Sequence, residues 1–271
     1  MNWKIKAGGL GLASLLYFSN PGYSENKAKS VYIAPGHDKR FPGSDGLAGS
    51  EAEIACKIAS KLENKLKIDP GLEVFVTRTE NGEYNPELTG FIEAHYDLYE
   101  KIIFDNFIST NTTRKYKNIR AFKRYLDSSN ELFDRENPHY KFMLLGIADY
   151  ANTMKFDAMV SIHLNKADKK KSKKPEGFVI FYSRKNQEPE KSKLLAYSIY
   201  KRIKKDFKAS NNPGETEGVV ERDDLLLVNV EIPSVLIECG YIDEIKFKNP
   251  IVLDKIINNL DRGIIDYLRK E

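Results

Sequence analysis

The stretch Val31-Tyr-Ile-Ala-Pro-Gly-His37 decides the fold, because it joins a short apolar run to a histidine at its end. Two later stretches follow the same plan: Ala158-Met-Val-Ser-Ile-His163 also ends on histidine, and Ser234-Val-Leu-Ile-Glu238 ends on a carboxylate. The chain has only four histidines, so two of them at the ends of apolar runs indicate a shared purpose. In an open α/β sheet, ligands bind beyond the carboxyl ends of the strands. We therefore expect one site, built from these three strand ends.

Helical segments separate the apolar runs. A helix is expected from about Ser50, because Ser50 and Glu53 have the spacing of a capping box and an apolar stripe at helical spacing follows. Further helices are expected over 144–153, 191–207 and 252–269, and further strands over 73–77 and 177–183. This alternation predicts the α/β class, with a mostly parallel or mixed central sheet covered by helices on both faces.

Residues 80–139 interrupt the alternation with a long aromatic and basic segment that contains no motif. Helical patches near 88–108 and 115–127 indicate a helical insert in the catalytic domain. Long segments beside a site are often functional, so a lid or a docking surface for a protein activator is one interpretation. A purely structural subdomain is the other. We interpret the two histidines of this segment, His95 and His139, as surface or packing residues.

Residues 1–24 have the pattern of an export signal. Two lysines precede an apolar stretch, and small residues permit cleavage after Ser24. The stretch is shorter than the roughly 20 residues that span a bilayer, and no later segment is apolar enough to do so. We therefore expect an exported catalytic domain, 25–271, in the periplasm or in the cell wall and extracellular space, with no transmembrane anchor after cleavage.

Charge and cysteine content narrow the partners. The formal net charge of the full chain is +4, which gives no reason to expect a nucleic acid partner. We interpret the lysine-rich run 169–174 as a solvated loop, although it could also attract an anionic polymer. Cys56 and Cys239 both lie in apolar surroundings, and we expect buried free thiols rather than a disulfide.

The two strand-end histidines predict a metal site. Catalytic zinc takes three protein ligands from histidine and carboxylate, and it keeps a fourth position for water. His37 and His163 supply the imidazoles, and the carboxylate must come from a segment that folds back onto the His37 strand. Glu51 fits because the turn-rich loop after His37 returns directly to the first helix. Glu53 is the competitor, although its position also suits the helix cap.

Other common catalytic patterns are missing from the sequence. It contains no His-Glu-x-x-His helix, no Gly-x-Ser-x-Gly elbow and no phosphate-binding Gly-x-x-x-x-Gly-Lys loop. The usual metalloprotease arrangement, a serine hydrolase and a nucleotide-driven enzyme are therefore excluded.

Five motifs, in order, resemble the zinc-dependent N-acetylmuramoyl-L-alanine amidases of bacterial cell-wall turnover. They are Ala34-Pro-Gly-His37, Gly49-Ser-Glu51, Val76-Thr-Arg78, Ser161-Ile-His-Leu-Asn165 and Pro233-Ser-Val-Leu-Ile-Glu-Cys-Gly-Tyr241. The resemblance implies an α/β sandwich, His37, Glu51 and His163 as ligands of one Zn²⁺, and Glu238 as the catalytic carboxylate. The chain departs from the family pattern at Tyr241-Ile-Asp, where Phe and a following Asn are usual, and in the segment 80–139.

Two further residues carry two interpretations each, and a third carries one. Asn165 could orient the substrate, or it could shape its loop through its own backbone. Arg222 could bind a carboxylate of the substrate, or it could pair with its acidic neighbours. Arg78 ends a strand, where a buried structural pair is expected.

The leading hypothesis is a secreted zinc hydrolase that cleaves the amide between N-acetylmuramic acid and L-alanine in peptidoglycan. Zinc would acidify the attacking water, and Glu238, with a pKa raised by burial, would move its proton to the leaving nitrogen. A zinc peptidase that cuts another amide of the same polymer is one alternative. A non-catalytic murein-binding regulator is the other.

Overall fold

The computed structural model describes residues 28–110, 138–167 and 175–271. Its centre is a six-stranded mixed sheet in the order β4-β1-β5-β8-β6-β7. The strands β4, β1, β5 and β8 run parallel, and β6 runs antiparallel to β8 and parallel to β7. The bounds are β1 (Lys29–Pro35), β4 (Leu72–Val76), β5 (Ala158–Asn165), β6 (Val179–Tyr182), β7 (Val219–Glu221) and β8 (Ser234–Tyr241). The predicted α/β class is confirmed.

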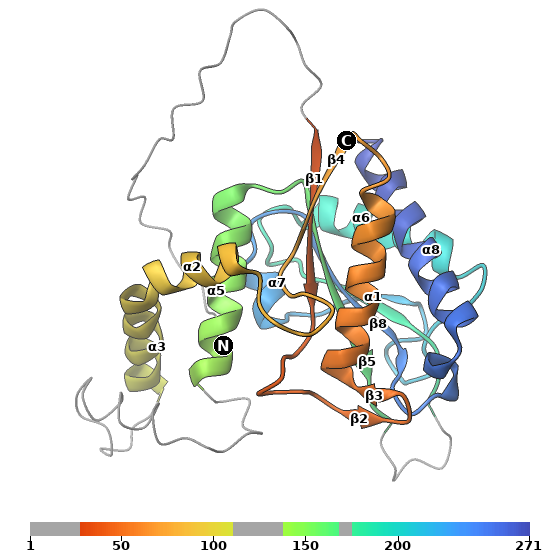
Figure 1. Cartoon of the computed structure of the whole chain (residues 1–271), viewed down its shortest axis with the longest axis horizontal. Helices are drawn as coiled ribbons and strands as arrows, with labels where there is room; N and C mark the ends of the chain where they lie inside the picture. Colours follow the sequence, from red (N-terminus) through yellow and green to blue (C-terminus); the bar gives the residue numbers. More distant parts are fainter. Residues whose placement is uncertain (1–27, 111–137, 168–174) are drawn as a thin grey trace, which may run out of the picture.

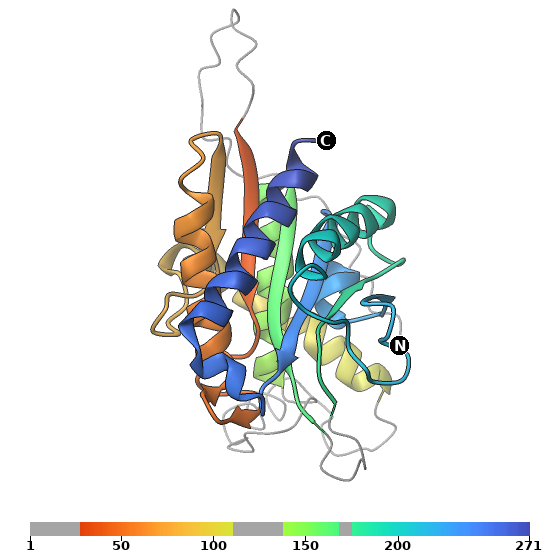
Figure 2. The ribbon, with the colours of Figure 1, turned by 90° about the vertical axis from the view of Figure 1, so that its right-hand side faces the viewer.

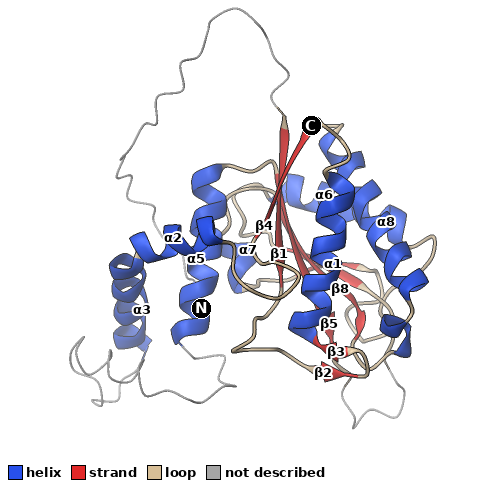
Figure 3. Cartoon of the chain, in the orientation of Figure 1, coloured by secondary structure: helices blue, strands red, loops and turns tan. Residues whose placement is uncertain are grey.

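Helices cover both faces of the sheet (Figures 1 and 3). On one face lie α1 (Glu51–Leu66), α6 (Pro189–Ile203) and α8 (Pro250–Leu268), which stand in front of the strands in Figure 2. On the other lie α5 (Pro138–Met154) and α7 (Leu225–Asn229), with α2 (Pro86–Ala94) and α3 (Tyr96–Thr110) packed against α5. The short strands β2 (Asp45–Gly46) and β3 (Gly49–Ser50) and the 3₁₀ turn η1 (Ile245–Lys248) complete the described elements.

The first strand shows why this arrangement forms. Its side chains alternate between the two faces of the sheet, as in any strand. Val31 and Ile33 enter the core beneath α1, α6 and α8, whereas Tyr32 and Ala34 enter the core beneath α5 and α7. All four are at most 2% exposed. Because both faces are buried, the strand is a continuous apolar run rather than an alternating one.

The start of α1 matches its sequence signature. The Ser50 amide donates to Glu53 Oε2 at 2.8 Å, and the Glu53 amide donates to Ser50 Oγ at 3.3 Å. The amides of Glu51 and Ala52 donate to loop carbonyls, those of Ser44 and Pro42. The predicted capping box is confirmed, and it fixes Glu51 in the first turn with its side chain turned inward.

Several sequence predictions lie outside the described residues: the export signal 1–24, the helical patch 115–127 and the lysine-rich run 169–174. The side chain of His139 also lies outside them. Helices α2 and α3 make up most of the described part of the segment 80–139, which also includes the turn before α2 and the first two residues of α5. Within the part of the chain that the structure describes, no helix has the length and apolarity needed to cross a membrane. Cys56 and Cys239 are buried free thiols, as predicted.

Candidate metal centre

The carboxyl ends of β1, β5 and β8 meet at one edge of the sheet, the lower edge in Figure 1. The Gly36 amide donates to the Ile162 carbonyl at 2.7 Å, which ties the loop after β1 to β5. His163 on β5 and Glu238 on β8 are register partners on adjacent strands. Register partners project from the same face of a sheet, so these two side chains are neighbours on the face that α5 and α7 cover.

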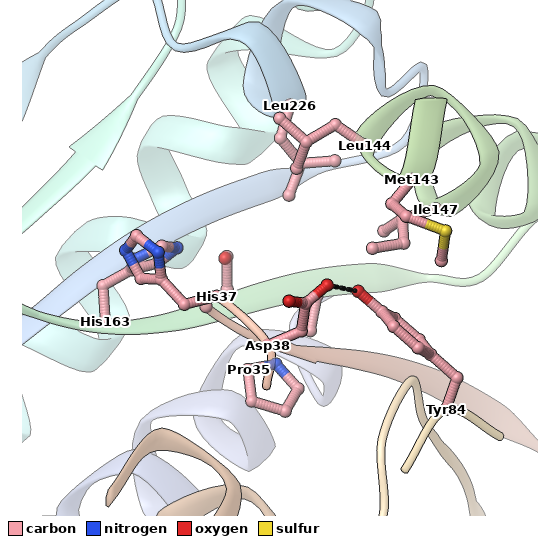
Figure 4. A pocket seen from close by; sticks show the side chains of 12 residues that line it. Pro35, His37, Asp38, Tyr84, Met143, Leu144, Ile147, His163 and Leu226 are labelled. Carbon is pink, nitrogen blue, oxygen red and sulfur yellow. Dashed lines mark hydrogen bonds between the residues drawn. The ribbon is translucent and has the colours of Figure 1, made fainter. Parts of the chain in front are cut away.

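Three predicted residues converge at this edge. His37 Nε2 lies 3.3 Å from Glu51 Oε2, and His163 Nδ1 lies 3.1 Å from Glu51 Oε1. One potential ligand atom from each of the three residues lies within 4.8 Å of the others. The two imidazole rings stand edge to face, with centroids 5.2 Å apart, as the neighbouring rings in Figure 4 show. Three separate segments of the chain thus present two nitrogens and a carboxylate to one point.

Glu51 is the central residue of this group and is only 4% exposed. Its carboxylate also accepts the amides of Leu164, at 3.1 Å, and Ser44, at 3.3 Å. Burial alone would raise the pKa of Glu51, but the hydrogen bonds and charges of His163 and His37 outweigh it and hold that pKa far below its usual range. The group is therefore an ionised carboxylate between two imidazoles, which is a donor set that suits a divalent metal ion.

Two glycines, Gly36 and Gly43, leave the space that the three side chains occupy. A Cβ at Gly36 would lie 2.2 Å from the His163 ring. A Cβ at Gly43, whose φ is +73°, would lie 2.6 Å from Glu51 Oε2 and 2.8 Å from the His37 ring. A larger residue at either position would displace one of the donor groups. The two glycines therefore let the loop pack directly against the three side chains. The residues present fit a bound metal ion.

Glu53, the alternative ligand in the sequence, has a different place. Its side chain is exposed and accepts the Ser50 amide in the capping box. The same first turn of α1 therefore carries one carboxylate that closes the helix end and another that faces the histidines.

Glu238 completes the edge with a carboxyl group that has a spare hydrogen-bonding atom. Its Oε2 is buried and has no hydrogen-bond partner among the described residues. Burial, reinforced by the negative charge of Glu51, raises the pKa of Glu238 to about 8, while the charge of Arg222 acts in the opposite direction. Such a group binds and releases a proton near neutral pH, which suits a general base and acid.

A pocket opens beside the histidines. The empty space within it and at its open side amounts to about 400 Å³. Its polar side is formed by His37, His163 and the hydrogen-bonded pair of Asp38 and Tyr84 (Figure 4). Its apolar side is formed by residues of α5 and α7, namely Met143, Leu144, Ile147 and Leu226. A concave site with an apolar wall and a few convergent polar groups is typical of a substrate pocket.

The structure also locates Asn165 and Arg222, the two candidates for contacts with the substrate. Asn165 Oδ1 accepts the amide of Lys166 at 2.9 Å, so this side chain shapes its own loop. The Arg222 guanidinium lies 3.5 Å from the centroid of Phe181 and 3.5 Å from Asp224 Oδ2. The contact with Asp224 matches the interpretation that Arg222 pairs with its acidic neighbours, and contact of Arg222 with the substrate stays a prediction.

Sequence reasoning missed the remaining pocket residues. Met143 and Ile147 belong to an ordinary apolar helix in the sequence, and Tyr84 belongs to a segment without a motif. The only sequence feature that could have pointed to Asp38 as a pocket residue is its position next to His37. Arg78 was expected in a buried pair; it is 1% exposed, and its Nη2 donates to the main-chain carbonyls of Pro35 and Gly36.

Comparisons with known proteins show which folds are similar. Solved structures of similar fold include the amidase Ami1 of Mycobacterium smegmatis, with 16% identity, a TM-score of 0.61, and 91% of this chain and 100% of that one covered. The catalytic domain of CwlV of Bacillus (Paenibacillus) polymyxa has 20% identity, a TM-score of 0.57 and coverages of 90% and 99%. The CwlD amidase of Clostridioides difficile, solved in complex with the GerS lipoprotein, has 25% identity, a TM-score of 0.56 and coverages of 90% and 100%.

A search of curated proteins gave no significant match. The model of one protein family, described as N-acetylmuramoyl-L-alanine amidase, matches residues 31–270. This range includes His37, His163, Glu51 and Glu238. The chain therefore belongs to the N-acetylmuramoyl-L-alanine amidase family.

Proposed function

We propose that this protein is an exported zinc amidase that hydrolyses the bond between the lactyl group of N-acetylmuramic acid and L-alanine in peptidoglycan. His37, Glu51 and His163 would hold one Zn²⁺, and Glu238 would be the catalytic carboxylate. One observation carries the proposal: three donor groups lie within 4.8 Å of one another, beside a carboxyl oxygen without a hydrogen-bond partner in the described part of the chain.

The three donors suit zinc by number and by type, since two imidazoles and one carboxylate leave a fourth position for water or substrate. When bound, the ion supplies a Lewis acid that polarises the scissile carbonyl and acidifies water. Glu51 contributes the negative charge, and the Leu164 amide fixes one of its oxygens at 3.1 Å. Such outer contacts keep a ligand oriented before the metal arrives.

Glu238 would move the protons of the reaction. It would accept a proton from the attacking water and donate one to the departing amine of L-alanine. Its place opposite His163 in the sheet register holds it beside the ligands, and β8 gives it a rigid support. Its Oε2 is free of other hydrogen bonds within the described residues, so the relay would break none.

The pocket wall and the basic groups would hold the substrate. The apolar residues of α5 and α7 face the metal centre across the pocket and would exclude water from the scissile bond. Arg222, stacked over Phe181 on the same face as Glu238, would bind a carboxylate of the stem peptide. Asn165 is the weaker candidate for a substrate contact, because Lys166 already occupies its Oδ1.

Residues 1–24 would direct the chain to the periplasm or to the cell wall and extracellular space, and 25–271 would form the catalytic domain with its insert at about 80–139. A protein activator is a further partner that we propose. Its motivation is the helical insert beside α5 and the lipoprotein bound to the C. difficile amidase.

The test is product analysis. Metal-free protein, reloaded with Zn²⁺, should release stem peptides with a free L-alanine amine from purified peptidoglycan, as mass spectrometry of the fragments would show. Cleavage at another amide would support the peptidase alternative, and binding of peptidoglycan without turnover would support the regulator.

Variants assign the roles. Glu238→Gln should keep one zinc per chain and lose hydrolysis, because it removes the proton carrier and leaves the donors in place. Glu51→Gln should lose zinc, whereas Glu53→Gln, altered in the same helical turn but outside the centre, should keep it. Full hydrolysis by Glu238→Gln, or equal zinc content in Glu51→Gln and wild type, would overturn these assignments.

A further inference from the structure

We propose that Arg78 is the positioning residue of the metal centre, and that with Tyr84 it holds the His37 loop on both sides of the ligand. This inference rests on the proposed function of His37 as a metal ligand. It assigns a task to the hairpin 78–84, which neither the fold nor the ligand set explains.

Arg78 reaches the loop through main-chain atoms. Its Nη2 donates to the carbonyl of Pro35 and, at 2.8 Å, to the carbonyl of Gly36. The side chain is 1% exposed, so water does not substitute for it at these carbonyls. The Gly36 amide, on the opposite side of that residue, donates to the Ile162 carbonyl on β5. The backbone on the N-terminal side of His37 is therefore fixed through both its donor and its acceptor.

The fixed group matters because of the backbone angle that follows it. The Gly36 carbonyl belongs to the same planar peptide unit as the His37 amide. His37 has a φ of 62°, which is uncommon for a residue with a side chain and persists only where the surroundings impose it. Rotation about this angle swings the imidazole relative to the peptide plane. Holding the plane with Arg78 therefore holds the direction in which the His37 ring points.

Tyr84 supplies the second contact, on the C-terminal side of His37. Its hydroxyl donates to Asp38 Oδ2 at 2.8 Å, a bond visible in Figure 4. Asp38 Oδ1 in turn accepts the amides of Arg40 and Phe41, so it organises the loop that leaves the ligand. The residue before His37 and the residue after it are thus both held from the hairpin 78–84.

The hairpin is itself a single unit. Arg78 and Tyr84 form an antiparallel bridge, and the Thr79 amide donates to the Glu83 carbonyl at 2.8 Å. The Arg78 guanidinium also lies 5.8 Å from the centre of the Tyr84 ring. Both bonds to the loop come from one nitrogen, Nη2, whose direction is set by the plane of the guanidinium. Lysine carries a compact ammonium group that lacks this plane and its contact with the Tyr84 ring, so it is a poor replacement.

The experiment compares Arg78→Lys and Tyr84→Phe with a matched control, Arg202→Lys. Arg202 also makes two hydrogen bonds, to Asp266 between α6 and α8, but it lies away from the centre. The zinc dissociation constant, measured by competition with a chromophoric chelator, should rise about 10- to 100-fold in Arg78→Lys, as is usual when a residue behind a ligand is lost. Tyr84→Phe should show a smaller rise, and Arg202→Lys none.

A spectroscopic readout separates positioning from general stability. Cobalt(II) in place of zinc should give an altered visible absorption band in Arg78→Lys, and the control should keep the wild-type band even if its midpoint of urea unfolding falls. Wild-type zinc affinity and an unchanged cobalt band in folded Arg78→Lys would overturn the proposal. If Arg78→Lys does not fold, Tyr84→Phe decides, and unchanged affinity there overturns it. Zinc affinity is measured without substrate, so absent amidase turnover would count against the proposed function alone.

Discussion

Replacing Glu238 with glutamine should stabilise the metal-free protein in a pH-dependent way. The carboxyl is held beside Glu51 on a buried strand, and burial raises its pKa from an ordinary 4.5 to about 8. The folded protein therefore binds this proton more tightly than the unfolded chain does. The resulting stability is fully present below about pH 4.5 and is lost as the pH rises through about 8. Glutamine cannot ionise, so the variant should lack this loss.

The size of the effect follows from the shift. One pKa unit equals about 1.4 kcal/mol, so ionising the buried carboxyl should cost the native state on the order of 3–5 kcal/mol above about pH 8. The difference in unfolding free energy between Glu238→Gln and wild type should therefore grow by that amount from about pH 4.5 to about pH 8. The amide that replaces one carboxyl oxygen changes the unfolding free energy by an amount that is independent of pH. It therefore does not alter how the difference in unfolding free energy varies with pH.

Urea unfolding in the presence of a metal chelator measures the difference at several pH values. The chelator is needed because a bound cation would favour the ionised carboxylate and mask the effect. Glu73→Gln, which alters an exposed carboxylate on the edge strand β4, is the control and should give a flat difference. A flat difference for Glu238→Gln as well would refute the reasoning that this half-buried carboxyl, with its buried Oε2, is protonated in the metal-free fold.

Three further predictions follow from close packing and from charge. Gly43→Ala should weaken zinc binding about 10-fold or more, because the added Cβ would press on the Glu51 carboxylate. Gly214, which also has a left-handed backbone conformation but lies in open space, is the control, and Gly214→Ala should not change zinc affinity. Chelator competition measures both variants, and equal affinities would contradict the steric argument. Gly263→Ala should lower the unfolding free energy by about 1–3 kcal/mol, because its Cβ would lie 2.6 Å from a backbone atom of α6. Gly90→Ala, with open space around it in α2, should instead raise it by up to about 1 kcal/mol, and urea unfolding checks the two signs. Asp157 has a lowered pKa, because hydrogen bonds from the start of β1 outweigh the effect of its burial. The stability advantage of wild type over Asp157→Asn should therefore be present above about pH 4 and shrink as the pH falls below that value. An advantage that stays constant with pH would contradict this prediction.

The convergence of His37, Glu51 and His163 could be predicted from sequence because its signals are local. Each histidine ends an apolar run, and parallel strands bring such ends to one edge whatever the loops between them do. Glu51 and Glu53 both stayed candidates for the carboxylate, although the capping box favoured a role for Glu53 at the helix end. The structure distinguishes the two carboxylates, because Glu51 is buried and Glu53 is exposed in the capping box.

The surroundings of the ligands could not be predicted in this way. Burial of Arg78 at a strand end was expected, but its carbonyl partners lie more than forty residues away in the chain and depend on how the His37 loop turns. Tyr84 contacts Asp38 across a similar separation. The apolar wall residues Met143 and Ile147 have the spacing of any amphipathic helix, and only the packed fold shows that they line a pocket as well as pack in the core.

A crystal structure of the zinc-loaded protein, with data collected at the zinc absorption edge, tests the central claim most directly. We expect one anomalous peak per chain, bonded to an imidazole nitrogen of His37, one of His163 and a carboxylate oxygen of Glu51, with Glu238 adjacent and not bonded to it. A peak elsewhere in the molecule, or zinc held by fewer than these three side chains, would contradict the metal centre on which the proposed amidase reaction depends.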